Sequence, residues 1–152
     1  MRLNLCPVSQ QPPSLSTEAQ SQLLSPPVDV ERDDKIRRQF NFRDGSVLIA
    51  EWDGCNVGIE MVYLSWHDPA DQDQRVKDAL WLNGLVGGQV ISAEPLKAAL
   101  RKETGSNRVA VAIGDQGEAI EVQWMALDGS QLAPASLFSR LIVYSYIGPE
   151  GL

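Results

Sequence analysis

The chain has 152 residues, of which 43% are hydrophobic and 22% are charged, and its 20 acidic and 13 basic side chains give a formal net charge of −7. This length is enough for one globular domain with its own core, and the aromatic residues, four of them Trp, exclude a chain that is disordered throughout. Neither nucleic acid nor a membrane is expected as a partner, because phosphate binding depends on clustered Lys and Arg and a membrane span needs about 20 consecutive apolar residues.

Residues 1–34 differ in composition from the rest of the chain, because Ser, Gln and Pro dominate there and apolar residues are sparse. A segment of this kind cannot bury enough apolar surface to offset the entropy lost on ordering. We therefore predict a flexible tail over residues 1–34, followed by a single domain over residues 35–152. Within the tail, Ser16 or Thr17 can cap a short helix that reaches Leu24.

The N-terminal segment lacks the continuous apolar stretch that a Sec signal peptide requires, so we expect a cytoplasmic protein. Disulfides are rare in that compartment. The two cysteines, Cys6 and Cys55, are therefore expected to be free thiols.

Three strands are predicted after the tail. Apolar residues alternate in part over residues 36–42 and 47–52, and residues 57–66 form the most apolar and β-branched run of the chain. Asp-Gly pairs at positions 44–45 and 53–54 separate these runs and are typical of tight turns. The pattern predicts an antiparallel meander.

Two helices are predicted next. Asp68 can act as the N-cap of the first helix, with a proline at the first helical position, and apolar residues recur at helical spacing as far as Asn83. Ser92 can cap the second helix, which is expected to extend to Glu103. The glycines between the two helices indicate a loop.

The last third of the chain predicts a hairpin formed by residues 109–113 and 120–125. Residues 134–147 begin with a helical spacing of apolar residues, and we interpret them as a short helical turn followed by a final strand over residues 143–147. Together these elements predict an α+β fold. It consists of an antiparallel sheet of five or six strands, two helices packed on one face, and a disordered N-terminal tail before them.

Three residues are candidates for catalysis. His67, the only histidine, is followed by Asp68, and a histidine beside a carboxylate can act as a general base. Cys55 has the side chain of a thiol nucleophile. A structural explanation is favoured for each residue, because His67 can close a strand, Asp68 can cap a helix and Cys55 can belong to a turn.

The sequence indicates no metal and no cofactor. Asp68, Asp71 and Asp73 lack the spacing, the central glycine and the terminal Glu of a calcium loop. One histidine and two distant cysteines do not suit a zinc site, and the glycines do not form a phosphate-binding motif.

Two surfaces are candidates for binding. Trp81 falls outside the apolar stripe of the first predicted helix, and an exposed tryptophan is a common anchor of protein interfaces. The first predicted strand carries basic and aromatic side chains at Arg37, Arg38 and Phe40. For the second group, an edge strand that is protected by charge is the favoured explanation.

These observations favour a small, acidic, non-enzymatic protein that binds another protein, as an inhibitor, an immunity protein or a secretion chaperone does. We expect its acidic side chains to attract a more basic partner. Exposed strands at the edges of an open sheet also allow a homodimer.

Two alternatives stay open. The tail over residues 1–34 resembles in composition the unfolded leaders of substrates exported by needle-type bacterial secretion systems, so the protein could be an effector secreted by a non-Sec route. A small hydrolase that uses Cys55 or His67 with Asp68 is the other alternative.

Overall fold

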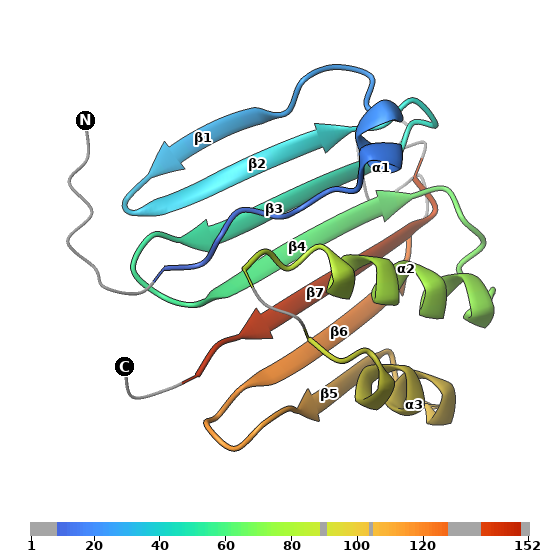
Figure 1. The fold of residues 1–152 in the computed structure, drawn as a ribbon. Coiled ribbons are helices and arrows are strands. Elements are labelled where there is room, and N and C mark those ends of the chain that lie inside the picture. The colour runs from blue at the N-terminus through green and yellow to red at the C-terminus, as the bar shows by residue number, and fades with distance from the viewer. Residues whose placement is uncertain (1–8, 89–90, 104, 128–137, 150–152) are drawn as a thin grey trace.

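Seven strands form one antiparallel sheet in the order β1-β2-β3-β4-β7-β6-β5 (Figure 1). The computed structural model describes residues 9–88, 91–103, 105–127 and 138–149. The strands are β1 (Val28–Arg32), β2 (Lys35–Asn41), β3 (Val47–Asp53), β4 (Gly58–Ser65), β5 (Arg108–Ala112), β6 (Ala119–Ala126) and β7 (Arg140–Ile147). The α+β class is confirmed, whereas the predicted count of five or six strands is wrong.

Within the described residues, three helices accompany the sheet: α1 (Thr17–Ser21), α2 (Gln72–Gly84) and α3 (Glu94–Lys102). Figure 1 shows α2 and α3 in front of the sheet, on the same side as the chain that leads into α1. The N-cap of α2 is Asp71, whose side chain accepts a hydrogen bond from the Gln74 amide, and not Asp68 as predicted. Among the described residues, no helix combines the length and the apolar character that a membrane span requires.

The core lies between the sheet and the helices. Successive side chains of a strand point to opposite faces. In β3, β4 and β7 every second side chain is buried on the helix side, and in β6 the buried side chains are Ile120, Val122 and Trp124. Helix α2 contributes Val76, Ala79 and Leu82, and α3 contributes Leu96 and Leu100. The strands contribute Phe40, Leu48, Ala50, Trp52, Ile59, Met61, Tyr63, Val109, Ile120, Val122, Trp124, Ile142, Tyr144 and Tyr146.

Strand β1 lies before the predicted boundary at residue 34 and belongs to the sheet. It pairs with β2 from Val28 opposite Gln39 to Arg32 opposite Lys35. All five of its side chains are exposed, so β1 is attached mainly by backbone hydrogen bonds, which composition does not reveal. This strand raises the count from six to seven.

The chain before β1 also contacts the domain. Gln10 is buried, its Nε2 atom donates to the Gly87 carbonyl oxygen at 2.7 Å, and its Oε1 atom accepts from the Gly58 amide at 3.1 Å. The Ser14 amide donates to the Leu85 carbonyl oxygen at 2.9 Å. Residues 1–8 of the predicted tail lie outside the described residues.

The predicted helical turn before the last strand is also partly wrong. Strand β7 begins at Arg140, three residues earlier than expected, so Leu141 and Ile142 are strand residues. Residues 134–137, where the turn was expected to begin, lie outside the described residues.

Candidate functional site

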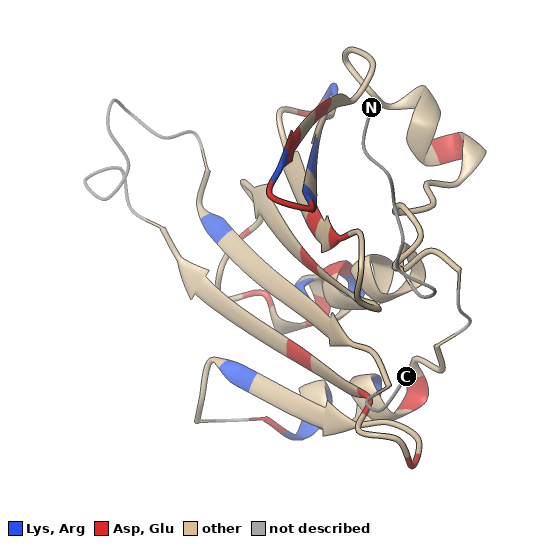
Figure 2. Cartoon of the chain, turned by 90° about the vertical axis from the view of Figure 1, so that its left-hand side faces the viewer, with Lys and Arg blue, Asp and Glu red and all other residues tan. Residues whose placement is uncertain are grey.

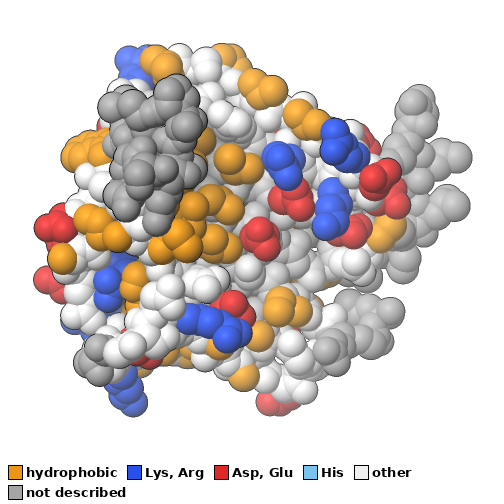
Figure 3. Space-filling view, turned by 180° about the vertical axis from the view of Figure 1, so that it is seen from behind, with side chains coloured by type: hydrophobic (Ala, Val, Ile, Leu, Met, Phe, Trp, Pro, Cys, Tyr) orange, Lys and Arg blue, Asp and Glu red, His pale blue; other side chains and the backbone are white. Residues whose placement is uncertain are grey.

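One face of the sheet has no described helix or strand over it, and we call it the open face. Figure 3 views the molecule from this side and shows hydrophobic side chains gathered in one region, next to a cluster of basic and acidic side chains. The side chains that alternate with the core residues define the open face. They are Val28, Val30, Arg32, Lys35, Arg37, Gln39, Asn41, Val47, Ile49, Glu51, Asp53, Glu60, Val62, Leu64, Leu141, Val143, Ser145, Ile147, Ala119, Glu121, Gln123, Met125, Arg108, Ala110 and Ala112.

The middle of the open face is apolar. Two neighbouring rows of cross-strand partners provide seven apolar side chains, six of them half-buried and the seventh, Met125, 45% exposed. We call these residues the apolar patch: Val47, Ile49, Val62, Leu64, Leu141, Val143 and Met125. Exposed apolar side chains extend it, because Val28, Val30 and Ile147 also lie on the open face.

The charges of the open face cancel. Its basic residues are Arg32, Lys35, Arg37 and Arg108, and its acidic residues are Glu51, Asp53, Glu60 and Glu121. The chain carries a net charge of −7, so the excess of acidic groups lies elsewhere on the protein. Figure 2 shows charged residues concentrated on β1, β2 and β3, whereas β5, β6 and β7 carry one each.

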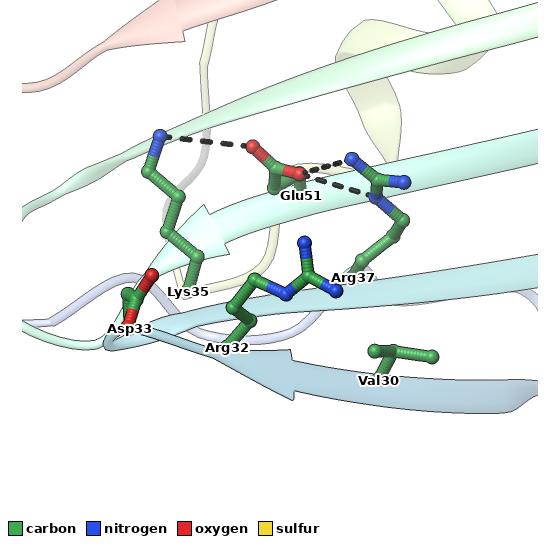
Figure 4. Close-up of a pocket in the computed structure, with 6 residues that line it drawn as sticks. All are labelled: Val30, Arg32, Asp33, Lys35, Arg37 and Glu51. Carbon is green, nitrogen blue, oxygen red and sulfur yellow. Dashed lines mark hydrogen bonds and ion pairs between the residues drawn. The ribbon is translucent and has the colours of Figure 1, made fainter.

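A depression of about 330 Å³ lies at the β1–β2 end of the open face (Figure 4). We call it the basic corner, and its lining residues are Val30, Arg32, Asp33, Lys35, Arg37 and Glu51. The Glu51 carboxylate accepts from Nε and Nη2 of Arg37 at 3.2 and 3.0 Å and lies 3.8 Å from Nζ of Lys35. Because Glu51 and Asp33 offset two of the three cations, the basic corner is only weakly positive and is not a strong site for a free anion.

The structure separates the residues that were predicted to form a binding strand. Arg37 lies on the open face, but Arg38 points to the other face, where its guanidinium donates to the Asp29 carboxylate at 2.7 and 2.9 Å. These hydrogen bonds hold the pKa of Asp29 below its usual value. Phe40 is 3% exposed and belongs to the core, so its side chain is not available to a partner.

Trp81 is half-buried, contrary to the expectation of an exposed anchor. Its ring makes edge contacts with Phe42 and Tyr63, at centroid distances of 5.9 and 5.2 Å. It lines a small depression of about 210 Å³ between α1, α2 and the β2–β3 turn. The exposed tryptophan is Trp66, whose indole donates to the Asp44 carbonyl oxygen at 2.8 Å.

His67 is paired with a carboxylate that the sequence did not indicate. Its Nδ1 atom lies 2.9 Å from Oδ2 of Asp78 on α2, whereas Asp68 accepts the Ala70 amide in a local turn. Oδ2 of Asp78 also accepts from Arg140, which is 1% exposed. Nδ1 of His67 also lies 3.1 Å from Nη2 of Arg140, so the imidazole ring belongs to the polar cluster around the buried Asp78 carboxylate, and we interpret its role there as structural.

Asp78 and Arg140 could not be found from spacing, because 62 residues separate them. A signal was present nonetheless: Asp78 is an acidic residue among the buried positions of α2, next to Ala79. A buried carboxylate requires a partner.

Cys55 does not have the thiol that a nucleophile requires, because it is disulfide-bonded. The prediction of two free thiols is therefore wrong for Cys55, and Cys6 lies outside the described residues. Cys55 precedes β4 and His67 follows it, so about eight strand residues, or roughly 26 Å, separate them. The structure thus places Cys55 far from His67 and Asp68, and it pairs the His67 ring with Asp78.

Among the residues that the structure describes, no three His, Cys, Asp or Glu side chains are grouped closely enough to hold a metal ion. Comparisons with protein-family models, curated proteins and solved structures found no significant match. The open face is the candidate site, because it carries the apolar patch.

Proposed function

We propose that this protein is a small non-enzymatic binding module that holds another protein against its open face. The observation that carries the proposal is the apolar patch, because the strands that form it are apolar on both faces, the open face and the core side. An antiparallel sheet with one solvated face normally presents polar side chains to water. Strands β4 and β7 instead place Val62, Leu64, Leu141 and Val143 on the open face. Contiguous exposed apolar surface of this kind is typical of an interaction site.

The charge distribution suits a protein that contacts its partner with one surface and attracts that partner with the charges of another. The open face has no net charge, so its contacts depend on apolar burial together with a few local ion pairs. The excess negative charge on the rest of the protein can attract a more basic partner over a longer range. An inhibitor, an immunity protein or a secretion chaperone acts by such contacts and needs no reacting group.

The two alternatives gain no support from the described residues. An unfolded export leader over residues 1–34 would have to exclude β1, which pairs with β2 along its whole length. A hydrolase would need the catalytic candidates in one cleft, and Cys55 lies at the opposite end of β4 from His67 and Asp68.

A pair of variants tests the proposal by affinity capture of the tagged protein from cell lysate. Met125→Glu places a charge in the apolar patch at an exposed position, and Ala98→Glu places the same charge at an exposed position of α3. We expect the wild type and Ala98→Glu to retain the same stoichiometric partner and Met125→Glu to lose it. Equal retention by all three proteins would show that the open face is not the contact surface.

A further inference from the structure

We propose that the partner that covers the open face is a second copy of this chain, related by a two-fold axis that lies over β4 and parallel to it. The inference rests on the proposed function in its choice of the open face as the contact surface, and it names the occupant of that face. The attraction of a more basic partner is a separate part of that proposal, because a second copy carries the same net charge of −7. The symmetry of the open face, its charges and its size each support this arrangement.

The first argument is the order of side chains across the sheet. Strand β4 is the middle strand of the seven, with β3 and β7 beside it and β2 and β6 beyond them. A two-fold axis over β4 places β3 opposite β7 of the other copy, and β2 opposite β6. The contact is self-complementary only if side chains at equal distances from β4 suit each other.

The row of cross-strand partners through Val62 meets this condition. From β2 to β6 it consists of Gln39, Ile49, Val62, Val143 and Gln123, and it is nearly the same in both directions. In the dimer, Val62 packs on its own copy, Ile49 packs on Val143, and the two glutamines face each other. Apolar groups thus meet apolar groups, and amides meet amides.

The neighbouring row continues the pattern. It contains Asn41, Val47, Leu64, Leu141 and Met125 in order from β2 to β6. Leu64 packs on its own copy and Val47 packs on Leu141 of the other copy. Asn41 faces Met125, a residue at the rim where water remains accessible.

The second argument is charge. In the row through Glu60, Arg37 lies two strands to one side of β4 and Glu121 lies two strands to the other. The two-fold axis therefore brings Glu121 of each copy, which accepts from Arg108 of its own chain at 2.8 Å, to the basic corner of the other copy, with two Arg37–Glu121 contacts in total. The arrangement also places Glu60 opposite Glu60 of the other copy. The two carboxylates repel each other, so a substitution of Glu60 is a sensitive test of the arrangement.

The third argument is area. Six spacings of about 4.8 Å give the open face a width of about 29 Å, and seven residues at about 3.4 Å give a length of about 24 Å. The product is about 700 Å² per copy, close to the roughly 800 Å² per partner of a standard protein interface. Two sheets packed face to face about 10 Å apart form a β-sandwich, in which the apolar patch becomes a second core.

The test is sedimentation velocity of the full chain over a range of concentrations at physiological salt. We expect a monomer–dimer equilibrium for the wild type. Arg37→Glu and Glu121→Arg should each raise the dissociation constant by about tenfold or more, and the double variant should restore it, because the same two positions then carry opposite charges again. Arg101→Glu makes the same change of charge on α3 and should leave the dissociation constant unchanged.

Glu60→Gln is the control for variants that dissociate only because their fold is damaged. It removes the unfavourable pair on the axis, so it should lower the dissociation constant. A dimer whose dissociation constant does not respond to any open-face variant would overturn the arrangement. A wild type that stays monomeric would overturn self-association, and the proposed function would still stand if Met125→Glu lost a different captured protein.

Discussion

Replacement of the buried Asp78–Arg140 pair offers a quantitative test of the structural role that we assign to the His67 cluster. Asp78→Leu leaves the Arg140 guanidinium buried without its carboxylate. Removal of one member of a buried ion pair costs about 3–5 kcal/mol of unfolding free energy, because the remaining charge is desolvated without compensation. Nε and Nη1 of Arg140 already lack a hydrogen-bond partner among the described residues, so little else supports this charge.

The double variant Asp78→Leu with Arg140→Met removes both charges. Apolar replacement of a whole buried pair is often close to neutral. We therefore expect the double variant to be more stable than Asp78→Leu alone, with a coupling energy of about 2 kcal/mol or more. Urea denaturation without reductant, followed by tryptophan fluorescence, gives the unfolding free energies of the wild type, both single variants and the double variant.

The exposed pair Asp29–Arg38 provides the matched control. The same substitutions there, Asp29→Leu and Arg38→Met, should show a coupling energy below about 1 kcal/mol, because water screens an exposed ion pair. Additive effects of the two substitutions at Asp78 and Arg140 would refute our explanation of the cluster.

Three further predictions concern stability. Asp33→Val should lower the melting temperature by an amount that corresponds to about 1–2 kcal/mol, because Asp33 has a φ of 50° and a β-branched side chain is strained there; an unchanged melting temperature would contradict this. Tyr144→Phe should cost about 1–3 kcal/mol in urea denaturation, because the buried Oδ1 atom of Asn83 loses the donor that now lies at 2.6 Å; a loss of less than about 0.5 kcal/mol would count against that hydrogen bond. The Arg38 hydrogen bonds lower the pKa of Asp29 in the folded state, so their stabilisation is present above the unfolded-state value of about 4 and is lost as pH falls through the folded-state value. The difference in unfolding free energy between the wild type and Asp29→Asn should thus shrink from pH 7 to pH 2, and a difference that grows in acid would be the opposite result.

The strands could be predicted wherever apolar alternation reports burial. The hairpin of β5 and β6 and the meander of β2, β3 and β4 follow from such alternation and from turn residues. Strand β1 could not be predicted, because all five of its side chains are exposed and no apolar alternation therefore marks the strand. In β7, Leu141 and Ile142 lie on opposite faces of one strand, although the same spacing also fits a helix.

The candidate site was harder to predict than the fold. The apolar runs of β4 and β7 are visible in the sequence, but only the sheet order shows that half of each run points to a face without a helix. Arg37 and Arg38 were grouped because they are adjacent, although adjacent strand residues point to opposite faces. The partner of His67 depended on a tertiary contact between α2, which carries Asp78, and the residues that follow β4, and linear spacing does not encode this contact.

Site-specific photocrosslinking tests the central claim, that the open face is a contact surface for a second copy, most directly. A photoreactive phenylalanine analogue is placed at position 125 on the open face and, in a control protein, at position 98 on α3. The arrangement predicts a covalent dimer from position 125, joined to the β2 peptide that contains Asn41, and no dimer from position 98. Cross-links from position 98 alone, or cross-links from position 125 that never reach β2 of another copy, would contradict it.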